Sequence, residues 1–240
     1  MEPVTLLRVK TARSLQFLVL LLLGFPLWQA HAQQTVFDVP SADILDKGKV
    51  YGELDATARP VNPVATFTPR VVVGVGGQIE VGGNLDGPST DTPFEPIISP
   101  TIKWRAWKDE NSGWSFFLGD NLLIPVSHRT YDAGNYAYAF FSKRWKNGTR
   151  LDLGGYDFTV HVVANANRAG GQFSLEQPIR KRVTLAAEWY TGNHASGYVN
   201  PGAIFKLTSK LTLYTAYQIG NSGVTSGNHQ FLWELGYNFN

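Results

Sequence analysis

Apolar and polar residues alternate along this chain in stretches of about ten residues, as in β-strands that face two different environments. The last stretch, Gln230–Phe239, is the clearest: Phe231, Trp233 and Leu235 fall on one face and Glu234 falls on the other. Because a strand turns successive side chains to opposite sides, this pattern predicts a ribbon with one apolar face and one mostly polar face. Such a strand suits a barrel with lipid outside and water inside.

Twelve stretches of this kind follow one another, separated by turn residues. An even number of strands returns the C-terminus to the side of the N-terminus. We therefore predict an all-β fold, a transmembrane antiparallel up-and-down β-barrel of about 12 strands over residues 48–239. The predicted strands are Lys49–Ala58, Phe67–Val75, Gln78–Leu85, Ile98–Trp107, Trp114–Val126, Tyr136–Arg144, Thr149–Phe158, Gly170–Gln177, Val183–Tyr190, Tyr198–Leu207, Leu211–Ile219 and His229–Phe239.

The connections between these stretches alternate strictly between short and long. The short ones include Gly76-Gly77 and a turn that contains Asn147-Gly148. These residues readily adopt the positive φ angles that tight hairpin turns require. Long ones include Asp86–Pro96 and Gly220–Asn228. Outer-membrane barrels have short periplasmic turns and longer outer loops, so we expect the short turns in the periplasm and the long loops outside. A soluble sandwich has no reason for such an alternation.

Aromatic residues are expected to form a belt at each rim, because amphipathic rings favour the membrane–water interface. The alternative is that they fill the core of a sandwich. The expected periplasmic belt comprises Tyr51, Trp104, Trp107, Trp114, Trp145, Tyr237 and Phe239. The expected outer belt comprises Phe67, Phe94, Tyr131, Tyr136, Tyr138, Trp189, Tyr190 and Tyr198.

Two segments fit the alternation poorly. In Trp114–Val126, Asp120 falls on the same strand face as residues expected to meet lipid, such as Leu118. A carboxylate facing lipid costs on the order of a few kcal/mol, so we expect a β-bulge near Gly119 to reset the register. Residues 33–47 show no clean alternation, and we interpret them as an N-terminal periplasmic lead-in for which helix and strand both stay open.

The start of the chain has the organisation of a secretory signal peptide. Arg8, Lys10 and Arg13 precede a leucine-rich stretch, Phe17–Trp28, and then Ala30-His31-Ala32. A basic start, a short apolar core and an A-x-A site predict a signal peptide over residues 1–32, cleaved after Ala32. The alternative is an uncleaved anchor, but the core is shorter than the roughly 20 apolar residues that a spanning helix needs.

Removal of the signal peptide changes the charge balance. The full chain has 21 Lys+Arg and 19 Asp+Glu, of which residues 1–32 hold three and one, so 18 of each remain. A neutral mature chain gives no support for a nucleic-acid partner, and we expect none. The chain has no cysteine, so hydrogen bonds and packing must hold the exported protein together, as they do in a closed barrel.

The export signal, the amphipathic strands and the closing Leu235–Phe239 together resemble a bacterial outer-membrane β-barrel protein of Gram-negative cells. The resemblance covers residues 48–239 and implies outer-membrane lipids and the barrel-assembly machinery as partners. Phe239, with Tyr237 two residues earlier, would be the assembly signal, although Asn240 departs from the usual aromatic end. The chain is also similar, more loosely, to small solute channels of the nucleoside-channel type and to outer-membrane proteins linked to phenol-degradation pathways, but no motif fixes either family.

The function of a barrel has to be read from its lumen, because the fold does not dictate it. A twelve-stranded barrel lies between small barrels filled by side chains and large ones with an open channel. We predict a passive, porin-like channel for a small solute, without cofactor or metal; an internal lattice of salt bridges that closes the bore is the alternative. The predicted pore-lining residues are Glu53, Asp55, Arg70, Glu80, Lys103, Arg105, Arg150, Asp152, Glu176, Glu188, Lys206 and Glu234.

Two further functions stay open. Lipid hydrolases among outer-membrane barrels use a His and a Ser two positions apart, so that the imidazole can take the hydroxyl proton. His194 and Ser196 have that spacing, but they fall in a glycine-rich loop and lack the Asn that follows the Ser in those enzymes. We therefore expect no enzyme. The other possibility is a closed structural or adhesive barrel whose outer loops bind a surface partner.

Overall fold

The computed structural model describes residues 34–61, 64–88, 90, 95–127, 131–159, 161–163 and 165–239. The predictions for the signal peptide, Phe94 and Asn240 lie outside these residues. Within the described ranges, no helix is long and apolar enough to cross a membrane.

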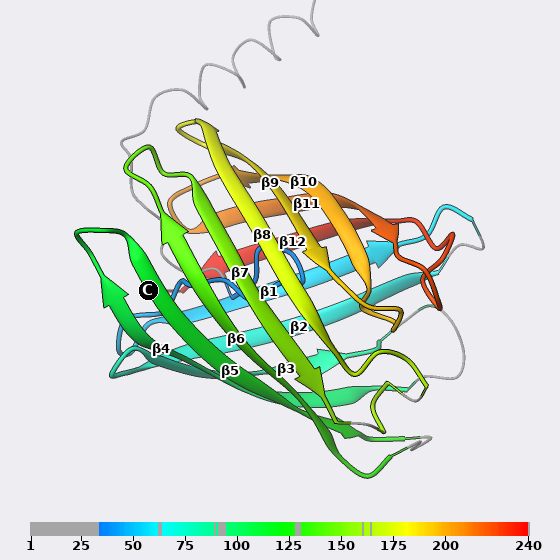
Figure 1. The fold of residues 1–240 in the computed structure, drawn as a ribbon. Coiled ribbons are helices and arrows are strands. Elements are labelled where there is room, and N and C mark those ends of the chain that lie inside the picture. The colour runs from blue at the N-terminus through cyan, green and yellow to red at the C-terminus, as the bar shows by residue number, and fades with distance from the viewer. Residues whose placement is uncertain are drawn as a thin grey trace, which may run out of the picture.

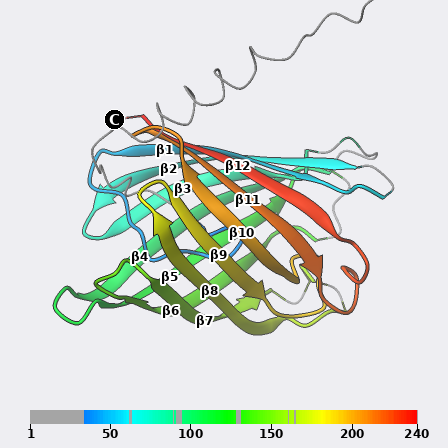
Figure 2. The ribbon, with the colours of Figure 1, turned by 90° about the horizontal axis from the view of Figure 1, so that it is seen from above.

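Twelve antiparallel strands form a closed barrel, which confirms the predicted fold class (Figures 1 and 2). Each strand pairs with its neighbours in sequence, and β12 pairs with β1 to close the ring. The strands are β1 (Val50–Ala58), β2 (Ala65–Gly76), β3 (Ile79–Asp86), β4 (Ile97–Asp109), β5 (Trp114–Pro125), β6 (Gly134–Arg144), β7 (Arg150–Phe158), β8 (Ala169–Arg180), β9 (Val183–Tyr190), β10 (Tyr198–Lys206), β11 (Leu211–Gly220) and β12 (Gln230–Asn238).

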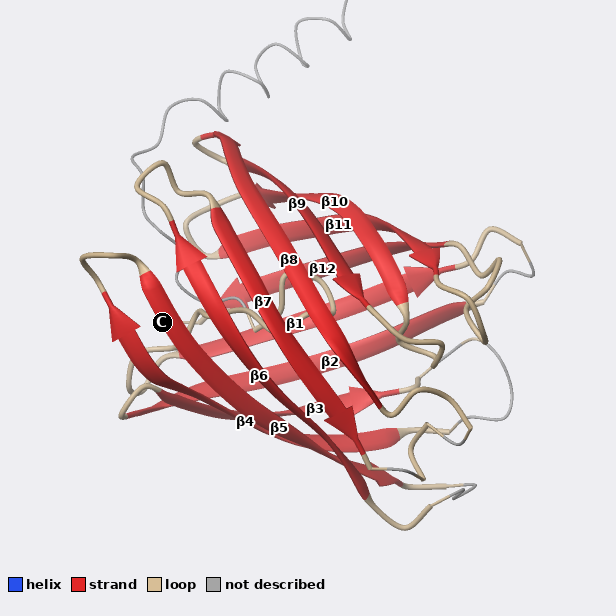
Figure 3. Cartoon of the chain, in the orientation of Figure 1, coloured by secondary structure: helices blue, strands red, loops and turns tan. Residues whose placement is uncertain are grey.

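The connections gather by length at the two rims (Figure 3). We call the rim with tight connections, such as residues 77–78 and 181–182, the short-turn end. The opposite rim, with connections such as residues 87–96 and 159–168, is the long-loop end. This matches the alternation predicted from sequence.

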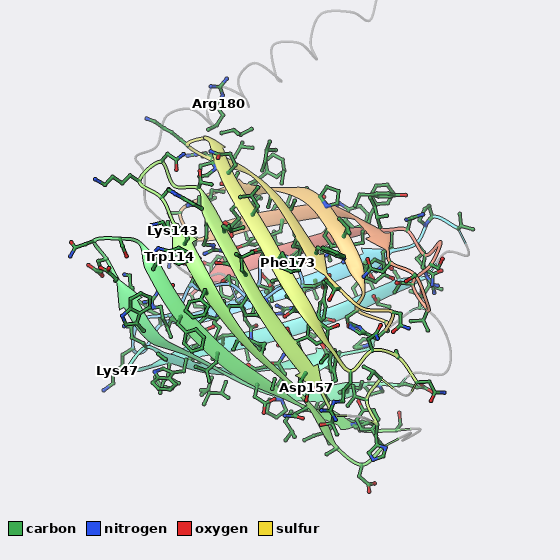
Figure 4. The ribbon with its side chains drawn as sticks, in the orientation of Figure 1. Lys47, Trp114, Lys143, Asp157, Phe173 and Arg180 are labelled. Atoms are coloured by element: carbon green, nitrogen blue, oxygen red, sulfur yellow. The ribbon has the colours of Figure 1, made fainter. Side chains whose placement is uncertain are left out.

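Many large apolar residues lie exposed on the outer wall of the barrel, and many polar and charged residues are buried in its lumen. On β12, Leu235 is 44% exposed whereas its neighbour Glu234 is only 1% exposed. The outer wall carries further rings, such as Phe173 on β8, and Trp114 lies beside Lys143 at the short-turn end (Figure 4). An apolar outer wall is the surface that a lipid bilayer requires. Tyr237 and Phe239 also face outward, and their recognition by assembly machinery stays a prediction.

The expected β-bulge near Gly119 is wrong. β5 pairs with β6 in unbroken register across this position. The register shift falls instead between β4 and β5, at Trp104–Trp107. Asp120 therefore stays on the outer face, where its Oδ2 accepts a hydrogen bond from Nδ2 of Asn135 at 3.1 Å. A local polar partner replaces the change of face that the sequence suggested.

Five aromatics of the expected belts face the lumen, and each is buried; for Tyr51 this agrees with the strand alternation, which sets it on the face of Glu53 and Asp55. For Tyr136 and Tyr138 the pattern of β6 explains the difference: aromatic residues alternate with alanines, so the inward face is the more aromatic of the two. A rule that sends apolar residues outward fails where the lumen wall is itself aromatic. The five inward residues are Tyr51, Tyr136, Tyr138, Tyr190 and Tyr198.

Candidate functional site in the barrel lumen

The twelve predicted pore-lining residues lie on the strands, and their side chains are buried or half-buried in the lumen. The structure brings most of them into ion-paired groups, and their role in lining an open pore stays a prediction. The first group is Glu53, Asp55 and Arg70, with Glu234 nearby; the second is Glu80 with Lys103; the third is Arg150, Asp152 and Glu176. Glu188, Arg105 and Lys206 lie outside these groups.

The lumen is occupied by the chain's own residues 34–45, which we call the N-terminal plug. Val36, Phe37 and Val39 in it are completely buried. A backbone bridge between Thr35 and Pro40 bends it into a tight loop, and it lies inside the ring of strands (blue in Figures 1 and 2). The expected periplasmic lead-in therefore lies inside the barrel, because its apolar side chains are buried against the lumen wall.

Glu188 of β9 holds the tip of the plug. Its carboxylate accepts hydrogen bonds from the backbone N–H groups of Phe37, Asp38 and Val39 at 3.0, 2.7 and 3.0 Å. Nδ2 of Asn200 donates both to Glu188, at 2.7 Å, and to the Asp38 carboxylate, at 2.9 Å. Three backbone N–H groups of the plug therefore converge on one buried carboxyl group, and this contact anchors the loop.

Asp43 holds the other side of the plug, toward the short-turn end. It pairs with Arg150 at 2.6 Å and with Arg144 at 3.1 Å. Burial by itself would raise the pKa of Asp43, but the two guanidinium groups outweigh burial and hold this pKa well below its usual range. Asp43 is therefore a carboxylate at neutral pH. Arg150 also pairs with Asp152 and Glu176 of the wall, so one buried cation joins plug and barrel.

A third contact joins the plug to β3 and β4 of the barrel wall. Lys103 pairs with Glu80 at 2.8 Å and donates to the backbone oxygen of Gln34 at 3.2 Å. Glu80 in turn accepts the backbone N–H of Leu45 at 3.0 Å. Both ends of the plug are thus fixed by one ion pair.

Apolar contacts supply the rest of the packing. Val36 and Phe37 pack in one cluster with inward residues of β9 to β12, including Tyr214 and Leu232. Val39 and Ala42 pack in a second cluster, which is the aromatic wall. Burial of a large apolar side chain stabilises a structure by about 1.5–3 kcal/mol, so the plug is retained by packing as well as by charge. The aromatic wall comprises Phe117, Tyr136, Tyr138, Phe140, Tyr156, Phe158 and Tyr190.

The space left around the plug is uneven. Toward the short-turn end there is a hollow of about 1050 Å³, lined by basic residues such as Arg105, Arg144 and Lys146 and by Asp43 of the plug. Deeper in the lumen, a polar cavity of about 80 Å³ borders Arg70 and Tyr138. The plug borders both spaces, and the wider one opens at the short-turn end.

The His194 and Ser196 pair does not form a nucleophile and base. Nδ1 of His194 accepts the backbone N–H of Ser196 at 3.2 Å, and Nε2 lies 2.7 Å from the hydroxyl of Tyr156. Burial lowers the pKa of His194, so its ring is neutral at pH 7. Ser196 is exposed. With both ring nitrogens engaged, neither is left to take a proton from the Ser196 hydroxyl.

No protein-family model matches the chain, and no curated protein matches it. Its fold is similar to that of an outer-membrane channel from Pseudomonas putida F1, with a TM-score of 0.55 and 9% identity over 84% of this chain and 99% of that one. The chain has the fold of an outer-membrane β-barrel. This fold and its apolar outer wall place the protein in the bacterial outer membrane.

A second solved structure, outer membrane phospholipase A from Escherichia coli, has a TM-score of 0.47 and 13% identity, over 82% of this chain and 94% of that one. At these identities the likenesses concern the fold, so the function has to come from the lumen.

Sequence reasoning missed the plug and the aromatic wall. The signal for the plug was weak but present: Val36, Phe37 and Val39 are apolar, although they precede the first strand and follow no strand period. An exported chain exposes such residues to water unless something covers them. In the structure, the wall of the lumen covers these three side chains.

Proposed function

We propose that the protein is a channel for a small solute and that the N-terminal plug holds it closed at rest. The observation that carries this proposal is that the plug belongs to none of the twelve strands. Its departure would therefore leave the sheet and its closing seam unbroken. In this proposal the short-turn end, with its wide mouth, faces the periplasm.

The size of the bore follows from what already fits in it. Barrels of about eight strands are filled by the side chains of their own wall. Here the wall leaves room for a folded loop of main chain, residues 34–45, with buried side chains as large as Phe37. A lumen that accommodates a polypeptide segment can pass a small solute once the segment moves. A purely structural barrel, in which the plug is a permanent filling, is the competing interpretation.

Tethering the plug separates these interpretations. The natural chain has no cysteine. Cysteines that replace Asp38 and Asn200, whose terminal Oδ2 and Nδ2 atoms lie 2.9 Å apart, can be joined by a short bifunctional thiosulfonate. In planar bilayers, the reduced double variant should show channel steps and the tethered one should lose them. The Asp38→Cys single variant, given the same treatment, controls for the chemistry.

A variant that lacks residues 34–45 keeps the test decisive. It should show larger and more persistent conductance than the parent protein. If neither this variant nor the parent gives channel steps after correct insertion, the channel proposal is refuted.

A further inference from the structure

Three carboxylates converge on the seam that closes the barrel. Glu53 and Asp55 of β1 and Glu234 of β12 each place an oxygen within 4.8 Å of the others. Asp55 and Glu234 stand directly opposite each other in the register of the two strands, which run side by side in Figure 1. All three are buried, and Glu234 is only 1% exposed. Like charges directly opposite on neighbouring strands repel each other, so this arrangement needs a counter-charge.

One guanidinium, that of Arg70, pairs with two of the three carboxylates. Arg70 lies 3.2 Å from Glu53 and also pairs with Asp55. With all three carboxylates ionised, the group keeps a net charge of two negative units. A buried charge is costly unless it is paired or coordinated.

Glu234 is the member that the protein leaves without a partner. Neither of its carboxylate oxygens has a hydrogen-bond partner within the described part of the chain. One oxygen each of Glu53 and Asp55 also lacks a hydrogen bond there, although that of Glu53 is the one near Arg70. One oxygen from each of the three side chains thus lies within 4.8 Å of the others, and the buried carboxylate of Glu234 has no hydrogen-bond partner in the described residues. This convergence suits a bound cation in addition to Arg70.

We propose that Glu53, Asp55 and Glu234 bind one divalent cation, with Ca²⁺ as the best match. Ca²⁺ takes six to eight oxygen ligands in flexible geometry and accepts bidentate carboxylates, whereas Mg²⁺ keeps several waters in a strict octahedron. A charge of two positive units balances the group. The ion bridges the first and last strands, so it clamps the seam through which the barrel closes.

Terbium luminescence tests the site on the intact refolded protein after EDTA treatment. Tb³⁺ replaces Ca²⁺ at oxygen sites, and Tyr51, whose hydroxyl donates to Glu53, is close enough to sensitise it. We expect emission that saturates at one Tb³⁺ per chain, is displaced by Ca²⁺, and is accompanied by a Ca²⁺-dependent rise in unfolding temperature at pH 7. Glu234→Gln should weaken binding at least tenfold, and Glu95→Gln, at an exposed loop position, should leave it unchanged.

Three results would overturn the proposal. The first is the absence of both emission and a Ca²⁺-dependent shift from pH 5 to 9, which would mean that the carboxylates hold protons instead. The second is undiminished binding in Glu234→Gln, which would place the ion elsewhere. The third is undiminished binding in Asp55→Asn, which serves as the second variant should Glu234→Gln fail to fold. The proposal is independent of channel activity, so a silent bilayer recording does not affect it.

Discussion

Replacing Glu188 with glutamine should loosen the N-terminal plug while leaving the sheet closed. The carboxylate accepts three backbone N–H groups, two through Oε2 and one through Oε1. Glutamine has a single accepting oxygen, and its NH₂ group would face an N–H donor. A lost hydrogen bond costs about 0.5–1.5 kcal/mol, and a buried amide left without a partner costs about 1–3 kcal/mol more. We therefore expect the docking of the plug to weaken by about 2–4 kcal/mol.

Hydrogen exchange measures this loss at the plug itself. A weakening of that size corresponds to a loss of protection of about 30- to 700-fold at the amides of Phe37, Asp38 and Val39. Amides within β1–β12 serve as the internal reference and should keep their rates. Glu95→Gln, which makes the same chemical change at an exposed position, should behave as the parent. Plug amides that exchange as slowly in Glu188→Gln as in the parent would refute the reasoning.

Three further predictions follow from other contacts. Gly119→Ala should lower the free energy of unfolding by about 1–3 kcal/mol, because the added Cβ would lie 2.3 Å from the Tyr138 hydroxyl. Heat-modifiable gel migration measures the fraction of folded barrel in urea, and an unchanged urea midpoint would argue against that packing. Because the pKa of Asp43 is held below its usual range, its ion pairs should stabilise the plug above about pH 4 and weaken as acid protonates the Asp43 carboxylate. Asp43→Asn should show less hydrogen-exchange protection of the plug amides at pH 7 than the parent, and a smaller further loss of protection in acid. Ser196→Ala should leave any release of fatty acid from phospholipid vesicles at the parent level, since both ring nitrogens of His194 are engaged; loss of a measurable activity would favour a hydrolase.

Most of the barrel could be predicted from the sequence, because strands and turns follow from local rules. Every predicted strand has a counterpart in the structure, and the last one, predicted at His229–Phe239, is β12 at Gln230–Asn238. Strand period and turn chemistry are properties of neighbouring residues, so a single sequence displays them. The same rules placed Glu53, Glu188 and Glu234 on the inward face correctly.

The docking of the plug and the aromatic lumen wall could not be predicted, because they depend on contacts between residues far apart in the sequence. Nothing near Phe37 indicates that Glu188 will accept its backbone N–H, since the two are 151 residues apart. The inward orientation of Tyr136 and Tyr138 was equally hidden, because both faces of β6 are apolar enough to meet lipid. Alternation assigns faces only where the two faces differ in polarity.

The plug also constrains the order in which this protein can be assembled. Residues 34–45 lead the described chain, yet the side chains that hold their tip, Glu188, Asn200 and Gln218, come from β9 to β11. The leading segment must therefore wait, undocked, until most of the sheet exists. β12 then has to meet β1 immediately downstream of that segment. Filling the interior is thus a late event in assembly, because the surface that receives the tip of the plug is incomplete until β9 to β11 are in place.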